Sequence, residues 1–376
     1  MYKRIFEKEI SNWIGSREIL IIYGARQVGK TTFIHHLLDD REDSIIFNCE
    51  LPDVFEILQS MNLESIKFLF GQSRIIALDE AQNIPLIGKV LKLIYDELPE
   101  YKLIVTGSSS FELSSHITEA LTGRNIKFRI FPLLLNELSQ KLNSIQLTQK
   151  LNELLIFGSY PALVDLSPEL KGRKLIELSS DYLFKDVLIH ESIKNPAVLR
   201  KLLKALALQL GSQVSLNELS SLLGISRQTV EKYIDLLEKS FIIFRLGSFS
   251  SNLRNEIKKS SKFFFYDNGI RNAIINNLNL IPNRTDMGAL WENYCVGEIV
   301  KQNLSLNLNS EFYFWRTYDG AEIDLIETHN AKITAYEFKW STKRKQKIPK
   351  SFDEKYKPSE FKTISPKNFY ELMITK

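Results

Sequence analysis

Cysteine and histidine are scarce in this chain. Its 376 residues include two cysteines, Cys49 and Cys295, and five histidines. The cysteines lie far apart in the sequence, and the histidines are not spaced like metal ligands, either with each other or with cysteine. The sequence therefore predicts neither a disulfide framework nor a structural zinc site, and it fits a reducing compartment.

Long apolar stretches and a signal sequence are also missing. No uncharged apolar run approaches the ~18 residues that a membrane helix needs, and the N-terminal residues do not have the pattern of a signal peptide. With 44% hydrophobic and 25% charged residues, the composition is ordinary for a globular protein. We therefore expect a cytoplasmic protein of two or three domains with no membrane partner.

A large net charge of either sign is absent, but the charge is distributed unevenly. The whole chain carries +4, whereas residues 331–376 contain twelve Lys or Arg and five Asp or Glu, a net +7. A basic C-terminal end suggests a polyanionic partner such as DNA. A solvated lysine-rich face is the commoner reason for such a bias, so both interpretations stay open.

The most informative motif lies near the N-terminus. The sequence from Gly24 to Thr31, GARQVGKT, fits the phosphate-binding loop pattern G-x-x-x-x-G-K-[ST]. An apolar run, Ile19–Tyr23, precedes it and a helical pattern follows it, as a loop that faces phosphates with a helix N-terminus requires. The Lys30 ammonium is expected to contact the β- and γ-phosphates, and the Thr31 hydroxyl to bind Mg²⁺. The predicted nucleotide-binding residues are Gly24, Ala25, Arg26, Gln27, Val28, Gly29, Lys30, Thr31 and Thr32.

An acidic pair follows a second apolar run. Ile75–Leu78 is apolar and leads into Asp79 and Glu80, some fifty residues after the loop. We expect Asp79 to hold the metal through water, and Glu80 to orient and deprotonate the attacking water. The GTPase motif Asn-Lys-x-Asp is absent, which favours ATP over GTP.

Three further residues are candidates for the same site. Thr106 and Ser108 end a third apolar strand, where they could bond the γ-phosphate or the attacking water. The alternative is that they cap a helix beginning near Ser109. Arg124 could stabilise transition-state charge, in its own subunit or in a neighbour, or it could be a surface arginine.

The middle of the chain changes character at about Val198. Residues 133–197 have mostly helical patterns, interrupted by Gly158-Ser159-Tyr160-Pro161. Three helical segments and two apolar strands follow, the order of a winged helix-turn-helix. In a DNA-reading mode the third helix would present Ser226, Arg227, Gln228 and Lys232 to the major groove. Nearby acids make that face nearly neutral, so a protein-binding or interdomain module is the alternative.

Carboxylates gather again near the C-terminus. A strand over 312–316, a turn at Tyr318-Asp319-Gly320 and a strand over 321–326 are followed by a strand over 333–340. Alternation puts Glu337 and Lys339 on one face of the last strand, and Asp324 on the adjoining strand. With a helical acid, Glu292 or Glu298, these residues could form a metal-dependent phosphodiesterase site with Mg²⁺ or Mn²⁺. A solvated strand face carrying a Glu-Lys pair is the alternative.

The order of these blocks resembles a family of prokaryotic AAA-like ATPases. Its members combine a P-loop core, a winged-helix segment and a C-terminal domain related to PD-(D/E)xK nucleases. The matching motifs are Gly24–Thr32, Leu78–Gln82, Thr106–Ser108, Leu121–Arg124, Gly158–Pro161 and Glu337–Lys339. The resemblance implies an α/β fold with an additional-strand P-loop core, ATP and Mg²⁺ as ligands, and Arg124 as a finger or sensor arginine. It also supports Asp324, Glu337 and Lys339 as nuclease-like positions, with Glu292 as the helical acid.

These observations predict four segments and a leading function. We expect an ATPase core over residues 1–135, a helical lid over 136–197, a winged helix over 198–280 and a nuclease-like domain over 281–376. The leading hypothesis is a Mg²⁺-dependent ATPase that couples its nucleotide state, ATP or ADP, to the C-terminal half. The alternatives are an ATP-gated, metal-dependent DNA endonuclease and a nucleotide-switched regulatory binding module without significant turnover. DNA, a protein partner and a homo-oligomer remain candidate partners.

Overall fold

The computed structural model describes residues 1–108, 120–182, 193, 195–250, 261–341 and 347–373. The chain divides into two compact units, Lys3–Phe131 and Pro132–Lys376, which are described separately. The helix expected near Ser109 falls outside the described residues. None of the described helices combines the length and the apolar character that a membrane span requires.

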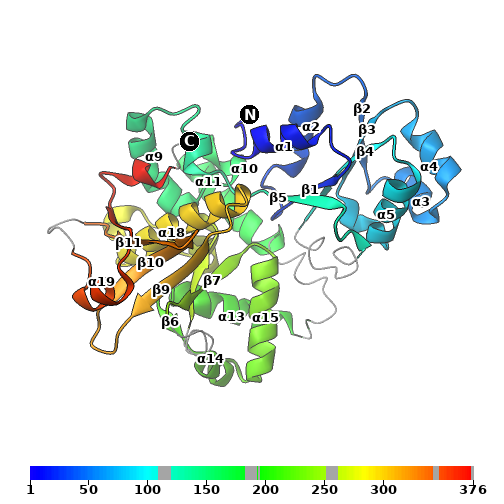
Figure 1. The fold of residues 1–376 in the computed structure, drawn as a ribbon. Coiled ribbons are helices and arrows are strands. Elements are labelled where there is room, and N and C mark those ends of the chain that lie inside the picture. The colour runs from blue at the N-terminus through cyan, green and yellow to red at the C-terminus, as the bar shows by residue number, and fades with distance from the viewer. Residues whose placement is uncertain (109–119, 183–192, 194, 251–260, 342–346, 374–376) are drawn as a thin grey trace. The chain divides into compact units, whose positions relative to one another are not determined.

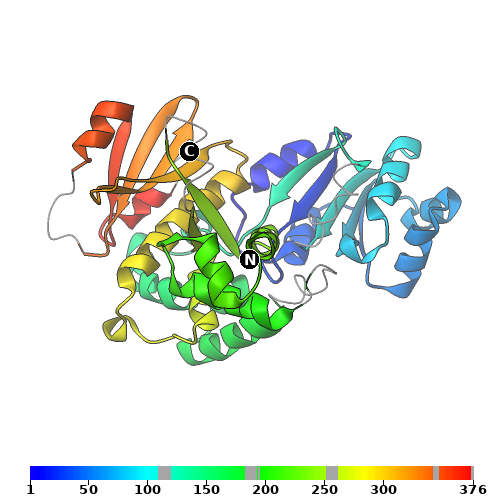
Figure 2. The ribbon, with the colours of Figure 1, turned by 90° about the horizontal axis from the view of Figure 1, so that it is seen from below.

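A five-stranded parallel sheet forms the centre of the first unit. Its strands are β1 (Ile19–Tyr23), β2 (Ser44–Asn48), β3 (Ile75–Asp79), β4 (Lys102–Gly107) and β5 (Asn125–Arg129). The order is β2-β3-β4-β1-β5, so β4 is inserted between the strand before the phosphate loop and the strand that ends in Asp79. This is the predicted additional-strand P-loop fold, and the strands run side by side in Figure 2. All residues of β1, β3 and β4 are buried, as expected for a parallel sheet covered by helices.

Helices flank this sheet. They are α1 (Glu7–Trp13), α2 (Lys30–Leu38), α3 (Pro52–Ser60), α4 (Leu63–Phe70) and α5 (Ile87–Glu97), with a short 3₁₀ turn at Ala81–Asn83. The strongly amphipathic α5 buries Val90, Leu91 and Ile94 on one face. In a parallel sheet the carboxyl ends of the strands share one edge, which places the phosphate loop beside the end of β3.

The second unit begins with helices, as expected for this region. These are α8 (Leu135–Leu138), α9 (Ser144–Phe157), α10 (Pro161–Val164) and α11 (Pro168–Glu177), followed by a π-helical turn at Leu178–Tyr182. Then come α13 (Pro196–Leu208), α14 (Leu216–Leu223), α15 (Arg227–Lys239), α17 (Asn268–Ile274), a 3₁₀ turn at Ile281–Asn283, α18 (Met287–Ser305), α19 (Lys350–Tyr356) and a 3₁₀ turn at Phe369–Leu372.

One mixed sheet of seven strands joins two regions that the sequence suggested as separate segments. Its strands are β6 (Gln213–Val214), β7 (Ile243–Ser248), β8 (Ser261–Phe265), β9 (Glu311–Arg316), β10 (Glu322–His329), β11 (Lys332–Phe338) and β12 (Glu360–Ile364). The order is β12-β11-β10-β9-β7-β8-β6, and the connection is made by β7 and β9, which pair in parallel (Figure 1). The helix α18 packs against this sheet, with Trp291 fully buried.

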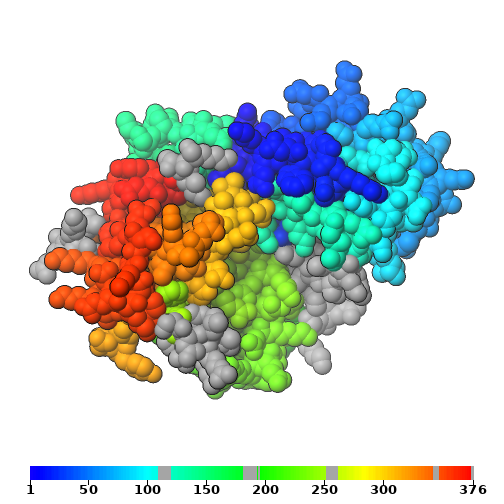
Figure 3. All heavy atoms as spheres, viewed as in Figure 1, coloured from blue at the N-terminus to red at the C-terminus, as the bar shows by residue number. Residues whose placement is uncertain are grey.

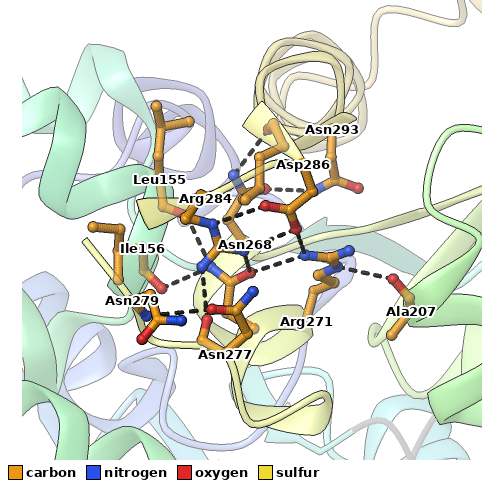
Figure 4. A network of polar contacts seen from close by, with 12 residues as sticks. Leu155, Ile156, Ala207, Asn268, Arg271, Asn277, Asn279, Arg284, Asp286 and Asn293 are labelled. Carbon is orange, nitrogen blue, oxygen red and sulfur yellow. Dashed lines mark hydrogen bonds and ion pairs between the residues drawn. The ribbon is translucent and has the colours of Figure 1, made fainter. Parts of the chain in front are cut away.

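A buried polar network ties helices of the second unit together (Figure 4). The Arg271 guanidinium on α17 donates to the Ala207 carbonyl of α13 at 2.9 Å and pairs with Asp286, the residue before α18. Arg284 pairs with the same carboxylate at 2.9 Å. The Asn272 amide donates to the last carbonyls of α9, including that of Leu155 at 3.0 Å. Four helical segments are therefore fixed by groups that would be costly to leave unpaired.

Candidate functional site

The phosphate loop adopts the conformation that its glycines predict. Gly29 has φ 93° and precedes α2, and Gln27 also has a positive φ of 59°. Such left-handed residues turn successive backbone amides toward one side, which makes an anion-binding cradle at the start of the helix. Gly24 is required for another reason: a Cβ there would lie 2.0 Å from the Ile130 carbonyl oxygen. The loop is therefore pressed against the segment that follows β5.

Two loop side chains have the contacts expected of a phosphate and metal site. The Lys30 ammonium donates to the carbonyl oxygens of Gly24, at 3.2 Å, and Ala25, at 2.9 Å, so it lies over the loop. The Thr31 hydroxyl donates to Asp79 Oδ2 at 2.7 Å. Because the hydroxyl proton is directed at Asp79, the lone pairs of Thr31 Oγ1 remain available for a cation. Hydroxyl and carboxylate oxygens are the ligands that Mg²⁺ prefers, so this donor set fits Mg²⁺.

Thr106 contacts the acidic pair from the neighbouring strand. Its fully buried hydroxyl donates to Asp79 Oδ1 and accepts the backbone N–H of Glu80 at 3.1 Å. The described geometry therefore gives Thr106 a role in positioning both acids, whereas the sequence had suggested contact with phosphate or water. Glu80 has φ 55° and ψ 40°, a left-handed conformation that is uncommon outside glycine. The Thr106 bond helps to hold it.

Gln82 and Cys49 complete the surroundings of the acids, and sequence reasoning gave neither of them a role. The Gln82 side chain donates to Glu80 Oε2 and accepts the backbone N–H of Ser108 at 3.1 Å. It thereby joins the ends of β3 and β4, and its place in the Asp-Glu-Ala-Gln sequence was the available signal. Cys49 follows β2 and is fully buried. Burial, with smaller contributions from Asp79 and Glu80, raises the pKa of its thiol to about 12, so it is a poor nucleophile.

Arg124 lies beside the start of β1, whereas the phosphate loop follows the end of that strand. It directly precedes β5, and its carbonyl accepts the N–H of Ile19, the first residue of β1. Its guanidinium pairs with Asp96 at 3.0 Å. A strand rises about 3.3 Å per residue, so the length of β1 separates Arg124 from the loop. The geometry therefore gives no support to a role for Arg124 at the loop of its own chain.

Arg129 lies near the loop, beside the residue that precedes it. It ends β5 and is in register with Tyr23, the residue before the loop. Its guanidinium carbon lies 5.6 Å from the centre of the Tyr23 ring. The sequence gave no motif for this position, because only the pairing of β5 with β1 brings it there.

The C-terminal residues that sequence reasoning combined do converge in the second unit. The Lys339 ammonium lies 2.5 Å from Glu337 Oε1 and 4.0 Å from Asp324 Oδ2. The backbone N–H of Phe338 donates to Asp324 at 2.7 Å. Of the two helical acids, Glu292 belongs to this group. Glu298 instead binds Lys301 at 2.6 Å and the N–H at the start of α8.

A buried lysine that the sequence did not single out bridges the same cluster. Lys262 on β8 lies 3.0 Å from Glu292 and 2.6 Å from Glu322. Burial, opposed by Lys262 and reinforced by Asp324 and Glu322, raises the pKa of Glu292 to about 8. Burial also raises the pKa of Asp324 and of Glu337. The cluster is thus a neutralised carboxylate-lysine group.

The predicted second metal site has no support in this geometry. Among the residues that the structure describes, no group of three or more His, Cys, Asp or Glu is arranged to hold a metal ion. In addition, Lys262 lies between Glu292 and Glu322, where its ammonium group offsets part of the carboxylate charge.

The expected DNA-reading residues lie at the start of α15. Arg227, Gln228 and Lys232 are exposed. Ser226 is the N-cap of α15, and its hydroxyl accepts the backbone N–H of Thr229 at 3.1 Å. Its side chain is therefore engaged in capping the helix.

Comparison with known proteins agrees with the phosphate loop and the first sheet. Residues 16–139 match the family described as an AAA domain. Residues 148–280 and 287–370 match two families described as domains of unknown function, DUF8612 and DUF4143.

Relatives and a solved structure extend this likeness over most of the chain. An uncharacterized protein of Methanocaldococcus jannaschii is 25% identical over 97% of this chain and 84% of its own length. One of Haemophilus influenzae is 24% identical over 82% of this chain and 79% of its own. The structure of a Walker-type ATPase of Pyrococcus abyssi is similar with a TM-score of 0.50 and 16% identity, over 73% of this chain and 96% of that one. Together with the loop geometry, the AAA-domain match supports ATP binding by residues 16–139, and the similarity to the Pyrococcus structure shows a shared fold.

Proposed function

We propose that this protein is a Mg²⁺-dependent ATPase whose nucleotide state acts on its C-terminal half. One observation carries the proposal: both Asp79 oxygens accept threonine hydroxyls, from Thr31 and Thr106, with Glu80 held beside them. This arrangement joins the phosphate loop, the metal-binding acid and the catalytic base in one bonded group. A binding site without turnover would not need a fixed base.

Each residue of the group has a defined role in this proposal. The loop amides and Lys30 bind and orient the triphosphate, and Thr31 and Asp79 hold Mg²⁺, which offsets phosphate charge when bound. Glu80 orients the attacking water and accepts its proton. Thr106 and Gln82 keep Glu80 in place, one through its backbone and the other through its carboxylate.

Steady-state ATP hydrolysis by variants tests this function. Lys30→Ala should abolish turnover and weaken nucleotide binding, whereas Glu80→Gln should abolish turnover while the nucleotide still binds. Lys67→Ala and Glu56→Gln, at exposed positions of the first unit, are matched controls that should keep wild-type rates. Turnover that survives both site substitutions would refute the ATPase. Binding with negligible turnover in the wild-type protein would instead favour the nucleotide-switched module.

Two arginines receive different roles in the same proposal. Arg129 acts at the loop of its own chain, and Arg124 acts only on the nucleotide of a neighbouring subunit in a homo-oligomer. A mixture of Arg124→Gln chains and Glu80→Gln chains should then recover activity. At a mixed interface the Arg124→Gln chain supplies Glu80 and the Glu80→Gln chain supplies Arg124, so one site is complete. Absence of recovery in the mixture would leave Arg124 as the surface partner of Asp96.

The C-terminal half is proposed as the part that responds to nucleotide. Residues 198–280 would act as a winged helix that binds DNA or protein through Arg227, Gln228 and Lys232. A metal-dependent nuclease is the second candidate, because Glu292, Asp324, Glu337 and Lys339 converge; a metal ion would have to displace the ammonium groups that now contact these carboxylates. Incubation of DNA with the full chain, ATP and Mg²⁺ or Mn²⁺ tests it. Cleavage should disappear in Glu337→Ala, and intact DNA with the wild-type protein would exclude the nuclease.

A further inference from the structure

A groove in the second unit is lined by aromatic and basic side chains that the ATPase proposal does not use. It has a volume of about 760 Å³, within the range of ~300–1,000 Å³ typical of ligand sites. Its walls come from the end of β7, from β9 and the turn that follows it, and from α19. Residues that matter for the argument are Phe249, Trp315, Arg316, Tyr318, Lys355 and Tyr356.

The aromatic wall is a packed cluster with one edge in the groove. The Phe249 and Tyr356 ring centres are 4.9 Å apart, and Tyr356 lies 4.8 Å from Phe352. Phe352 in turn packs 5.1 Å from Trp315 and is fully buried. Phe249 and Tyr356 remain half-buried, so the cluster anchors them while they line the hollow. Rings held in this way lose little entropy when a planar ligand stacks on them.

Tyr318 is exposed on a turn that is itself well fixed. The Thr317 N–H donates to the Ala321 carbonyl at 2.9 Å, and the Thr317 hydroxyl accepts the Ala321 N–H at 3.0 Å. Gly320, with φ 91°, allows the tight reversal. Tyr318 is fully exposed. Figure 3 shows this orange turn standing out from the surface next to the orange-red α19.

The charges of the groove favour an anionic ligand. The Arg316 side chain is 46% exposed and lies 3.9 Å from Glu322, which has a closer partner in Lys262 at 2.6 Å. Lys355 is exposed on α19. The groove is lined by one carboxylate, that of Asp319, and by the two cations Arg316 and Lys355. The lining therefore keeps a net positive charge.

We infer that this groove binds single-stranded nucleic acid, with bases stacking on Tyr318 and Tyr356 and phosphates facing Arg316 and Lys355. Proteins hold unpaired nucleic-acid strands with aromatic side chains, on which the bases stack, and with basic side chains placed along the sugar-phosphate backbone. A duplex keeps its bases stacked on each other and offers no base face to Tyr318, so the groove should prefer the single strand. The inference deepens the proposed function, because it names what the C-terminal half would hold.

Fluorescence anisotropy on the full chain tests the inference. The probes are labelled single strands of about 12 nucleotides, DNA and RNA, and the matching duplex. Tyr318→Ala should weaken single-strand binding by roughly 5- to 100-fold and leave duplex binding unchanged, and Tyr318→Trp should restore it. Arg316→Gln should lower the salt dependence of binding by about one phosphate contact.

Matched controls lie outside the groove in the same unit. Tyr370→Ala removes a tyrosine that is 51% exposed, and Arg173→Gln removes an arginine whose side chain is 85% exposed. Neither should change binding. No binding of either single strand, preference for the duplex, or equal losses in Tyr318→Ala and Tyr370→Ala would overturn the inference. ATP hydrolysis by Tyr318→Ala without nucleic acid separates the two proposals, because the ATPase stands if that rate is normal even when no strand binds.

Discussion

At the scale of single residues, the proposed nucleotide site depends on contacts that the sequence motifs do not specify. Thr106 contributes one hydroxyl, yet that hydroxyl contacts both acids. Gln82 contacts the Glu80 carboxylate and the next strand. Partners of this kind fix the orientation of the residues that act on substrate.

Replacing Thr106 should therefore reduce catalysis more than binding. Thr106→Val keeps the volume but removes the bonds to Asp79 and Glu80, and loss of such a supporting bond typically costs about 10- to 100-fold in activity. We expect kcat for ATP to fall by that factor while the affinity for ADP changes little. Thr106→Ser keeps the hydroxyl and should recover most of the rate. An unchanged kcat in Thr106→Val would contradict the positioning role.

At the scale of elements, the break at Gly158–Pro161 is a packing site between α9 and α17. Gly158 has φ 73°, and a Cβ there would lie 2.0 Å from the Asp267 carboxylate. That carboxylate accepts the N–H of Ser159 at 2.7 Å and caps α17 through Ile270 at 3.0 Å. The turn and the helix cap are therefore one structure, although more than a hundred residues separate them.

Gly158→Ala should destabilise the second unit. The Gly158 backbone, with φ 73° and ψ −163°, lies in a region adopted almost only by glycine and costs about 1–3 kcal/mol for another residue, and the contact with Asp267 adds to this cost. Gly172→Ala is the matched control, because Gly172 lies in α11 and its added Cβ would come no closer than 3.7 Å to Leu278. That change should be neutral or stabilising by about 0.5–1 kcal/mol. Denaturant unfolding followed by tryptophan fluorescence compares them, and equal stabilities would contradict the argument.

The polar network of Figure 4 makes a second prediction at this scale. Asp286→Ala leaves Arg271 and Arg284 buried beside each other without their shared carboxylate, which should cost about 3–5 kcal/mol. Asp235→Ala removes an exposed ion pair with Lys239 and should cost no more than about 1 kcal/mol. Hydrogen exchange of peptides from α9, α13 and α17 measures the difference. Similar protection in the two variants would show that the network is not needed to hold these helices.

At the scale of the whole molecule, the second unit is organised around one continuous sheet. The β7–β9 pairing links residues expected in a winged helix to those expected in a nuclease-like domain. Lys262 crosses the same boundary, because it lies on β8 and binds Glu292 on α18 and Glu322 on β10. The two regions therefore share one hydrogen-bonded sheet and one buried ion-pair cluster.

This cluster should make stability depend on pH. The pKa of Glu292 is about 8 in the folded protein, against an ordinary value of 4.5, because burial outweighs the attraction of Lys262. The folded state therefore favours the protonated acid. The resulting stabilisation is complete below about pH 4.5 and is lost as the pH rises through about 8.

Glu292→Gln should flatten this dependence. Melting temperatures measured between about pH 5.5 and 8.5 should fall with pH in the wild-type protein and fall less in the variant. The exposed substitution Glu177→Gln should leave the wild-type slope unchanged. A wild-type slope in Glu292→Gln would show that other groups cause the dependence.

Apart from the additional-strand core, which only the family resemblance implied, the sequence by itself determined the phosphate loop and the acidic pair. These features are local: a glycine-rich loop between an apolar strand and a helix can adopt few conformations, and Asp79 must follow its strand. Strand alternation likewise identified Asp324, Glu337 and Lys339 as candidates for one site, and the family resemblance added Glu292 in preference to Glu298.

Only the tertiary structure decided what these groups contact. It placed Arg124 beside the start of β1 and Arg129 beside its end, next to the phosphate loop, and it directed Thr106 to Asp79. It also brought Lys262 into the C-terminal cluster, where an ammonium group offsets the charge expected to bind metal. The reason is physical: these contacts depend on the order and register in which distant strands pair, and no local pattern along the chain specifies that pairing.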